Sequence, residues 1–196
     1  MLDRTQYLVK EHVGMLKLVD AYDIFDAETG EKLAVAKEEI HPVVQLLRLV
    51  INKQMMPTTV VIRAADSNDA VLTIKRGVAF LRSKVTVADA AGSPLGYFKS
   101  KLFSIGGGFD VFNLSDQKVA EVKGDWKGWN FKFRTAAGEE LGTVAKQWAG
   151  VAKELFTSAD NYVIALADGT PSNRSLAALL LAAGIAIDTV YKENKS

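Results

Sequence analysis

The sequence predicts a mainly β protein, a closed antiparallel barrel of about twelve strands around a hydrophobic C-terminal helix. Short strand-like segments recur along the chain with turn motifs between them, and residues 176–187 contain only Leu, Ala, Gly and Ile. A helix that is apolar around its whole circumference must be covered by protein or by lipid. A closed barrel could cover such a helix and would also leave no free strand edges.

The clearest elements are repeated β-hairpins, in which a polar turn with Gly, Asp or Asn precedes a returning strand. In the first of them, Asp26–Gly30 precedes Leu33–Lys37. The other four pairs are Asp66–Asp69 with Val71–Lys75, Ala88–Gly92 with Leu95–Lys99, Leu114–Gln117 with Val119–Lys123, and Thr135–Gly138 with Leu141–Lys146. A small residue follows the first aliphatic one in four of these strands (Ala34, Gly96, Ala120 and Gly142), which would allow a backbone or a packed helix to come close.

Further strands are expected from runs of β-branched and aromatic residues. They are Tyr7–Val9, Leu16–Val19, Tyr22–Phe25, Val78–Val87, Phe109–Asn113, Asn130–Arg134 and Tyr162–Ala167.

One segment interrupts the β pattern. Residues 42–53 begin with Pro42 and have apolar residues at 43, 46, 47, 50 and 51, which is helical spacing. We expect a helix packed on the outside of the sheet. An amphipathic segment resting on a membrane surface is the alternative.

The C-terminal helix is expected over residues 173–192, after Pro171, with N-cap oxygens offered by Ser172, Asn173 and Ser175. At about 1.5 Å per residue, the apolar residues 176–187 span roughly 18 Å. A bilayer core needs about 30 Å. The helix is therefore predicted to be the core of the barrel and not a membrane span.

Composition narrows the function classes. The chain has 196 residues, a net charge of +1 and no cysteine, which leaves no disulfide, thiolate nucleophile or thiolate metal site. We expect a single domain over residues 1–196, a monomer, and no nucleic-acid partner. The first residues lack the pattern of a signal peptide, so a cytoplasmic location, peripheral to the membrane, is expected.

Basic residues concentrate in the middle of the chain. Residues 71–134 contain 11 Lys and Arg against 5 Asp and Glu, a difference of +6. Alternation places cations on one face of three strands, so six of them could line one outer wall and attract an anionic lipid headgroup. Those candidate binding residues are Arg82, Lys84, Lys99, Lys101, Lys132 and Arg134. The alternative is that these are ordinary outward polar positions.

Catalytic patterns are not evident. His12 and His41 are the two histidines, and neither has the spacing of a nucleophile partner or metal ligand. Residues 106–108 are glycines but lack the Lys-Ser/Thr of a phosphate loop. Trp129, Phe131 and Phe133 share one face and are expected in the core, with Trp126 exposed at a turn. The alternative is that the four aromatic residues form a ligand platform. We therefore expect no enzyme activity, cofactor or metal.

Three segments in order carry a family resemblance: Ile105–Phe112, Gly124–Phe131 and Ala159–Tyr162. They resemble the phospholipid scramblase family, whose pattern is shared with the plant LURP-one-related proteins. The resemblance implies a tubby-like barrel threaded by its C-terminal helix. Scramblases are described as calcium-dependent lipid movers, and tubby domains bind phosphoinositides. Here Asp168 is the one carboxylate in residues 165–172, where that family places its calcium segment, whereas calcium takes about six to eight oxygen ligands.

Three functions follow as hypotheses. The first is a non-catalytic binding module for an anionic phospholipid headgroup or a protein partner. The second is a scramblase-like lipid translocator, which requires the terminal helix to leave the barrel and enter a bilayer. The third is a structural or regulatory domain without a ligand.

Overall fold

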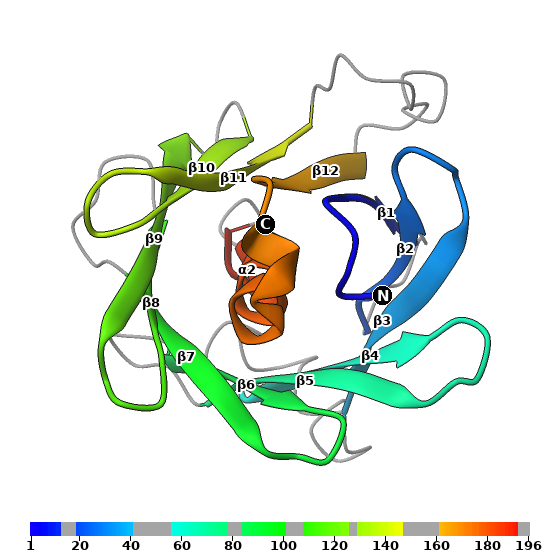
Figure 1. The fold of residues 1–196 in the computed structure, drawn as a ribbon. Coiled ribbons are helices and arrows are strands. Elements are labelled where there is room, and N and C mark those ends of the chain that lie inside the picture. The colour runs from blue at the N-terminus through cyan, green and yellow to red at the C-terminus, as the bar shows by residue number, and fades with distance from the viewer. Residues whose placement is uncertain are drawn as a thin grey trace.

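The structure is a computed structural model that describes residues 1–12, 19–40, 56–77, 84–100, 108–125, 129–146 and 161–191. In these ranges, twelve antiparallel strands form a closed barrel, confirming the predicted fold class. Each strand pairs with the next one along the chain, and β12 pairs back to β1, so the order in space follows the order in sequence (Figure 1). The strands are β1 (Gln6–Glu11), β2 (Ala21–Asp26), β3 (Lys32–Glu39), β4 (Thr58–Ala64), β5 (Ala70–Arg76), β6 (Lys84–Asp89), β7 (Pro94–Ser100), β8 (Gly108–Phe112), β9 (Lys118–Asp125), β10 (Asn130–Arg134), β11 (Glu140–Ala145) and β12 (Asn161–Leu166).

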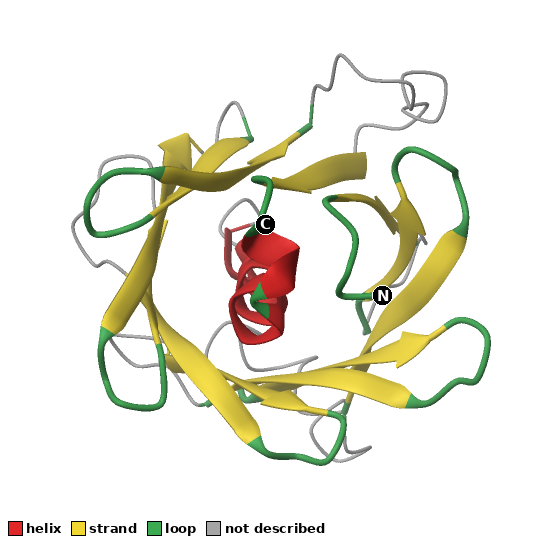
Figure 2. Ribbon diagram, in the orientation of Figure 1, coloured by secondary structure: helices red, strands yellow, loops and turns green. Residues whose placement is uncertain are grey.

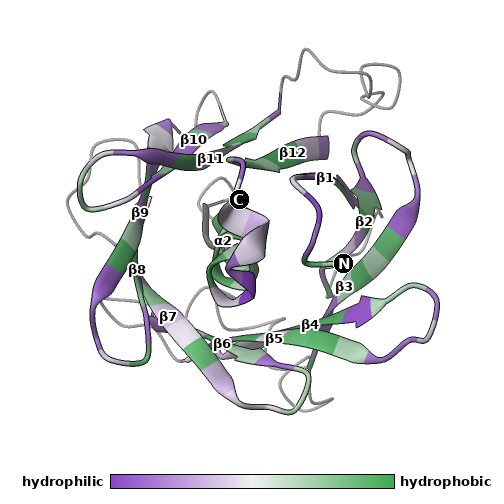
Figure 3. Cartoon of the chain, viewed as in Figure 1, coloured by the Kyte–Doolittle hydropathy of each residue, from purple (hydrophilic) through white to green (hydrophobic). Residues whose placement is uncertain are grey.

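The C-terminal helix α2 (Arg174–Tyr191) lies inside this barrel (Figure 2). All residues from 177 to 187 are buried, as expected for a helix without a polar face. The strands supply the surrounding wall because apolar and polar residues alternate along them (Figure 3), which points one set inward and the other outward. The prediction of a core helix is therefore confirmed.

Two residues position the helix. The Asn173 side-chain oxygen accepts a hydrogen bond from the Leu176 backbone N–H at 3.1 Å, so Asn173 is the N-cap among the three residues predicted to offer one. Near the other end, a Cβ added at Gly184 would lie 2.5 Å from Ile164 Cδ1 on β12. Glycine at this position lets the helix approach the barrel wall closely.

All five predicted hairpins are present, and each turn has one residue with positive φ. Three are glycines, whereas Asn68 and Asp116 adopt φ of 59° and 58°. Asn and Asp are the side chains that tolerate this left-handed conformation best. The positive-φ turn residues are Gly30, Asn68, Gly92, Asp116 and Gly138. The turn signals in the sequence thus correspond to a specific backbone requirement.

Each returning strand also contains a β-bulge, in which one aliphatic residue is passed over in the strand register. The passed-over residue packs partly buried against the core. These five residues, which we call the bulge ring, are Leu33, Val71, Leu95, Val119 and Leu141. The recurring small residues follow bulge residues, so their position marks the return to regular pairing. In an up-and-down barrel these hairpins share one end, which is also where β12 leads into α2.

The inner face of the barrel is not wholly apolar. Glu38, Thr58 and Arg76 occupy inward positions away from the hairpin turns and are at most 7% exposed. An Arg76 guanidinium N–H donates to Thr58 Oγ1 at 3.1 Å, and Glu38 accepts the backbone N–H of Asp20 at 3.2 Å. Buried polar groups are stable when they are hydrogen-bonded in this way. These buried polar residues were not predicted from the sequence.

Some predicted segments cannot be compared. The outer helix expected over 42–53 lies outside the described residues, as do residues 16–18 of the expected strand Leu16–Val19. The expected strand Val78–Val87 is described from Lys84, and β6 continues to Asp89, beyond the predicted end.

Candidate functional site

Four of the six predicted binding cations fall within the described residues. Lys84 lies on β6, Lys99 on β7, and Lys132 and Arg134 on β10. Their buried neighbours Val85, Phe98, Phe131 and Phe133 point inward, so the four cations lie on the outer wall. Arg82 and Lys101 lie outside the described residues.

Lys84 and Lys99 are directly opposite each other in the β6–β7 register. Both ammonium groups lie over the ring of Tyr97, with Nζ at 4.1 Å from the ring centroid for Lys84 and 5.2 Å for Lys99. Lys99 Nζ is also 4.9 Å from the centroid of Phe112. The Tyr97 and Phe112 rings are stacked, with centroids 5.0 Å apart and planes at 11°. Two cations therefore converge on one aromatic pair across β7 and β8.

The Tyr97 ring is fixed by a hydrogen bond. Its hydroxyl donates to the Asp116 carboxylate at 2.8 Å, from the β8–β9 turn. This bond raises the pKa of the Tyr97 phenol, and desolvation acts in the same direction. The phenol stays neutral at physiological pH, and its ring remains an uncharged platform beneath the lysines.

The electrostatic arrangement of the two lysines is unusual for neighbouring strands. Like charges directly opposite in a sheet repel and destabilise it. The π-faces of Tyr97 and Phe112 offset part of that repulsion. Within the described ranges, no carboxylate forms an ion pair with Lys84 or Lys99. Their positive charge is therefore not neutralised by a carboxylate of the described residues.

A third lysine belongs with them and was missed in the sequence analysis. Lys75 on β5 is exposed and lies opposite Thr86 of β6, two residues along from Lys84. The alternation of buried Ile74 and Arg76 around it could have identified it as outward. We call Lys75, Lys84, Lys99, Tyr97 and Phe112 the lysine–aromatic patch.

On β9 and β10, two outward lysines form ion pairs with carboxylates. Lys118 Nζ lies 2.8 Å from Asp110 Oδ1 and 3.1 Å from Glu121 Oε2. The hydrogen bond to Asp110 raises the Lys118 pKa, with Glu121 adding to it against the effect of burial. Lys132 Nζ pairs with Glu140 Oε2 at 2.9 Å. Lys118 and Lys132 therefore already have carboxylate partners.

The predicted cations consequently do not form one uninterrupted row. Along the register from Lys99, the next outward residues are Asp110 on β8, Glu121 on β9 and Arg134 on β10. Two carboxylates thus separate Lys99 from Arg134. Lys132 lies opposite Lys123 of β9, another exposed lysine that the sequence analysis did not include.

Other candidate groups have structural surroundings. Trp129, Phe131 and Phe133 are at most 9% exposed and belong to the core, as predicted, while Trp126 lies outside the described residues. His12 pairs with Asp23 at 3.0 Å, and His41 is not described. In the part of the chain that the structure covers, no cluster of three or more His, Cys, Asp or Glu side chains could hold a metal ion. Nor does any helix there combine the length and hydrophobicity needed to cross a bilayer.

Comparison with protein families gives a match over most of the chain. The model of the scramblase family matches residues 8–194, from β1 through α2. This range takes in the barrel and its enclosed helix. Comparison with curated proteins gives no match, and comparison with solved structures gives none either.

Proposed function

The chain belongs to the scramblase family, and from that premise we propose that it is a non-catalytic binding module. Its ligand is an anionic phospholipid surface, which docks on the lysine–aromatic patch. The observation that carries this proposal is the meeting of Lys84 and Lys99 over one aromatic ring without a carboxylate partner among the described residues.

Electrostatics support this choice of ligand. A lysine near an anionic membrane surface contributes about 1 kcal/mol. Lys75, Lys84 and Lys99 occupy three adjacent strands, so a single flat surface can reach all three. An anionic headgroup would also relieve the repulsion between Lys84 and Lys99. By contrast, Lys118 and Lys132 would have to exchange a carboxylate for the headgroup, with little net gain.

An exposed apolar side chain lies on the same side of the barrel. Leu114, in the β8–β9 turn, is 64% exposed and is the one large hydrophobic residue exposed to this degree in the described ranges. The turn continues from Phe112, whose ring belongs to the patch. Basic residues beside an exposed apolar group are a common arrangement in peripheral membrane binding.

The test is sedimentation with vesicles at low ionic strength, where electrostatic attraction is least screened. Vesicles of phosphatidylcholine alone are compared with vesicles that also contain phosphatidylglycerol or a phosphoinositide. The double substitution Lys84→Gln and Lys99→Gln should weaken binding to the anionic vesicles by about 2 kcal/mol, or roughly thirtyfold. Lys118→Gln with Lys132→Gln removes the same charge from two lysines that already pair with carboxylates and is the matched control.

Equal weakening by both double variants would show that net charge, and not the patch, drives binding. If the unmodified protein does not bind anionic vesicles at low salt, the lipid proposal is wrong, and a protein partner becomes the better hypothesis for this surface.

Docking is preferred to lipid translocation because of where α2 lies. Translocation by this helix would require residues 177–187, all buried, to leave the barrel for a bilayer. Resistance of α2 to protease in the presence of anionic vesicles is expected if the protein docks with its barrel intact. Vesicle-induced cleavage within α2 would instead favour the translocator.

A further inference from the structure

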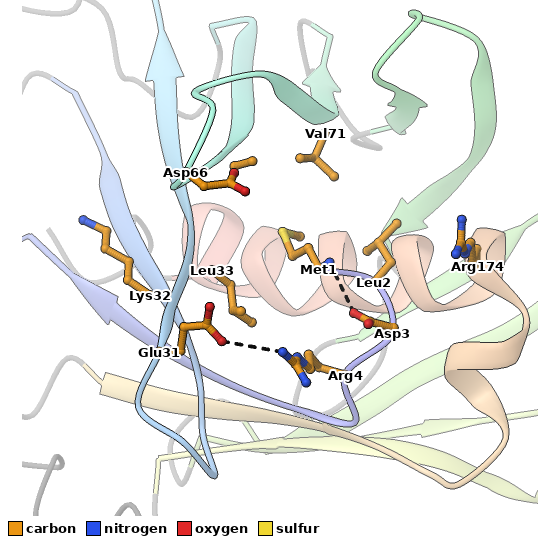
Figure 4. A pocket seen from close by; sticks show the side chains of 11 residues that line it. Met1, Leu2, Asp3, Arg4, Glu31, Lys32, Leu33, Asp66, Val71 and Arg174 are labelled. Atoms are coloured by element: carbon orange, nitrogen blue, oxygen red, sulfur yellow. Dashed lines mark ion pairs between the residues drawn. The ribbon is translucent and has the colours of Figure 1, made fainter.

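A second site lies at the end of the barrel where α2 begins. A cavity of about 490 Å³ opens there, within the range of pockets for small ligands (Figure 4). It is bounded by the N-terminal segment, the β2–β3 and β4–β5 hairpins and the first residue of α2. Its lining residues are Met1, Leu2, Asp3, Arg4, Glu31, Lys32, Leu33, Ala64, Asp66, Val71 and Arg174.

The floor of this cavity is apolar. Leu33 and Val71, two members of the bulge ring, are joined there by Met1 and Leu2. All four pack against the core but remain partly exposed. A ligand with an apolar portion would remove this remaining surface from water, which is favourable.

The N-terminal segment that forms one wall is firmly attached. Arg4 Nε lies 3.2 Å from Asp26 Oδ2, and Asp26 is buried. The Tyr7 hydroxyl donates to the backbone carbonyl of Arg4 at 3.0 Å. Asp26 Oδ1 accepts the backbone N–H groups of Glu28 and Thr29 in the β2–β3 turn. The wall is therefore built onto the hairpin through a buried carboxylate.

The rim carries charges of both signs, and most of them are already paired. Arg4 also lies 3.6 Å from Glu31, and Lys32 lies 2.8 Å from Asp23. Asp3 lies 3.2 Å from the backbone nitrogen of Met1.

Two rim charges remain. Asp66 and Arg174 have no oppositely charged partner among the residues that the structure describes. In Figure 4 they stand on opposite sides of the cavity, with Met1, Leu2 and Val71 between them. The guanidinium of Arg174 presents the fork of donors that suits a carboxylate or phosphate. The carboxylate of Asp66 suits an ammonium group.

From this arrangement we propose that the cavity binds a small zwitterion with an apolar body. Its anionic end meets Arg174, its ammonium end meets Asp66, and its body covers the apolar floor. A purely anionic ligand would leave Asp66 without an oppositely charged partner, and a purely cationic one would leave Arg174 without one. This site is separate from the lysine–aromatic patch and does not depend on the proposed membrane docking.

The experiment uses ω-amino acids as probes, because they carry an ammonium and a carboxylate at opposite ends of a methylene chain. A series from aminohexanoate to aminoundecanoate is titrated calorimetrically, beside the alkanoate and the alkylamine of each chain length. One length in the series should bind about tenfold more tightly than both of its singly charged counterparts, since each charged hydrogen bond adds affinity.

Two exposed substitutions assign the ends. Asp66→Asn should reduce the ω-amino acid to the affinity of the alkanoate, and Arg174→Gln should reduce it to that of the alkylamine. Lys99→Gln, on the outer wall, is the control and should change nothing. Thermal unfolding checks that each variant is folded. Equal binding of all three probe types, no binding at any chain length, or an unchanged preference in both variants would overturn the proposal.

Discussion

Strand β7 shows how differently the two faces of this barrel are built. Phe98 points inward and is fully buried, with its ring 6.2 Å from that of Phe109. The residues on either side, Tyr97 and Lys99, lie on the outer face and contact side chains of β6 and β8. Inner side chains thus share one apolar core around α2, whereas outer ones depend on the neighbours that the register provides.

The outer face itself also differs between two parts of the barrel. On β5 to β7, lysines lie over aromatic rings or are exposed, whereas Lys118 on β9 and Lys132 on β10 pair with carboxylates. The number of cations on a surface therefore does not determine what it binds. What matters is whether each charge already has a partner, because only an uncompensated charge gains much from a ligand.

Replacing an inward residue should have the largest effect. Phe98→Ala is expected to lower the free energy of unfolding by about 3–5 kcal/mol, because it removes a buried ring and leaves a cavity beside Phe109. Urea denaturation measures the loss. Lys99→Ala, the adjacent outward change, should stay within about 0.5 kcal/mol. Similar losses in the two variants would mean that the faces are not energetically distinct.

Removing the Asp110 carboxylate should increase the affinity of the outer wall for anionic vesicles. Asp110 lies opposite Lys99 and pairs with Lys118. Asp110→Asn should leave Lys118 less compensated and raise affinity for anionic vesicles by about 1 kcal/mol, or roughly fivefold. Glu139→Gln makes the same charge change in the β10–β11 turn and should raise it less. Equal gains would indicate a net-charge effect without local pairing.

The smallest effect concerns an ion pair on the outer face and appears as a pH dependence. Burial acts to raise the Asp23 pKa, but hydrogen bonds from Lys32 and His12 outweigh it, so the pKa is lowered from 3.8. A lowered pKa in the folded state stabilises the protein above pH 3.8 and ceases to do so as the pH falls through the folded-state pKa. Asp23→Asn should therefore cost about 0.5–1 kcal/mol at neutral pH, since its partners are half exposed.

The difference in free energy of unfolding between the unmodified protein and Asp23→Asn should shrink as unfolding is measured at successively lower pH. A difference between the two proteins that stays constant from neutral pH to below pH 3.8 would contradict an ionised role for Asp23.

Local patterns were sufficient to predict most of the fold. The turn residues identified the hairpins because Gly, Asn and Asp supply the positive φ that each turn requires. The apolar run of residues 176–187 predicted the enclosed helix because it is too short to span a bilayer and must therefore be covered by protein. The bulges were not predicted. A passed-over residue such as Leu141 differs from an ordinary strand residue only in its pairing with another strand.

The candidate site was harder to predict because it, too, depends on which strands pair with each other. Alternation correctly placed Lys84 and Lys99 on the outer wall, but whether six cations act together depends on which strands are neighbours. The pairing of Lys132 with Glu140 follows from the bulge at Leu141, which brings Glu140 opposite Arg134. Lys75 could have been predicted from the same alternation. The opposed charges of Asp66 and Arg174 could not, because they come from segments about a hundred residues apart.

The position of α2 has a consequence for biosynthesis. The chain leaves the ribosome from its N-terminus, so all twelve strands are made before the helix that fills their interior. Until α2 emerges, inward residues such as Phe98 and Phe133 lack the helix that completes their core. The β1–β12 pairing that closes the barrel likewise joins the first strand to the last. A nascent chain of this protein must therefore keep eleven strands from aggregating until β12 and α2 have been made.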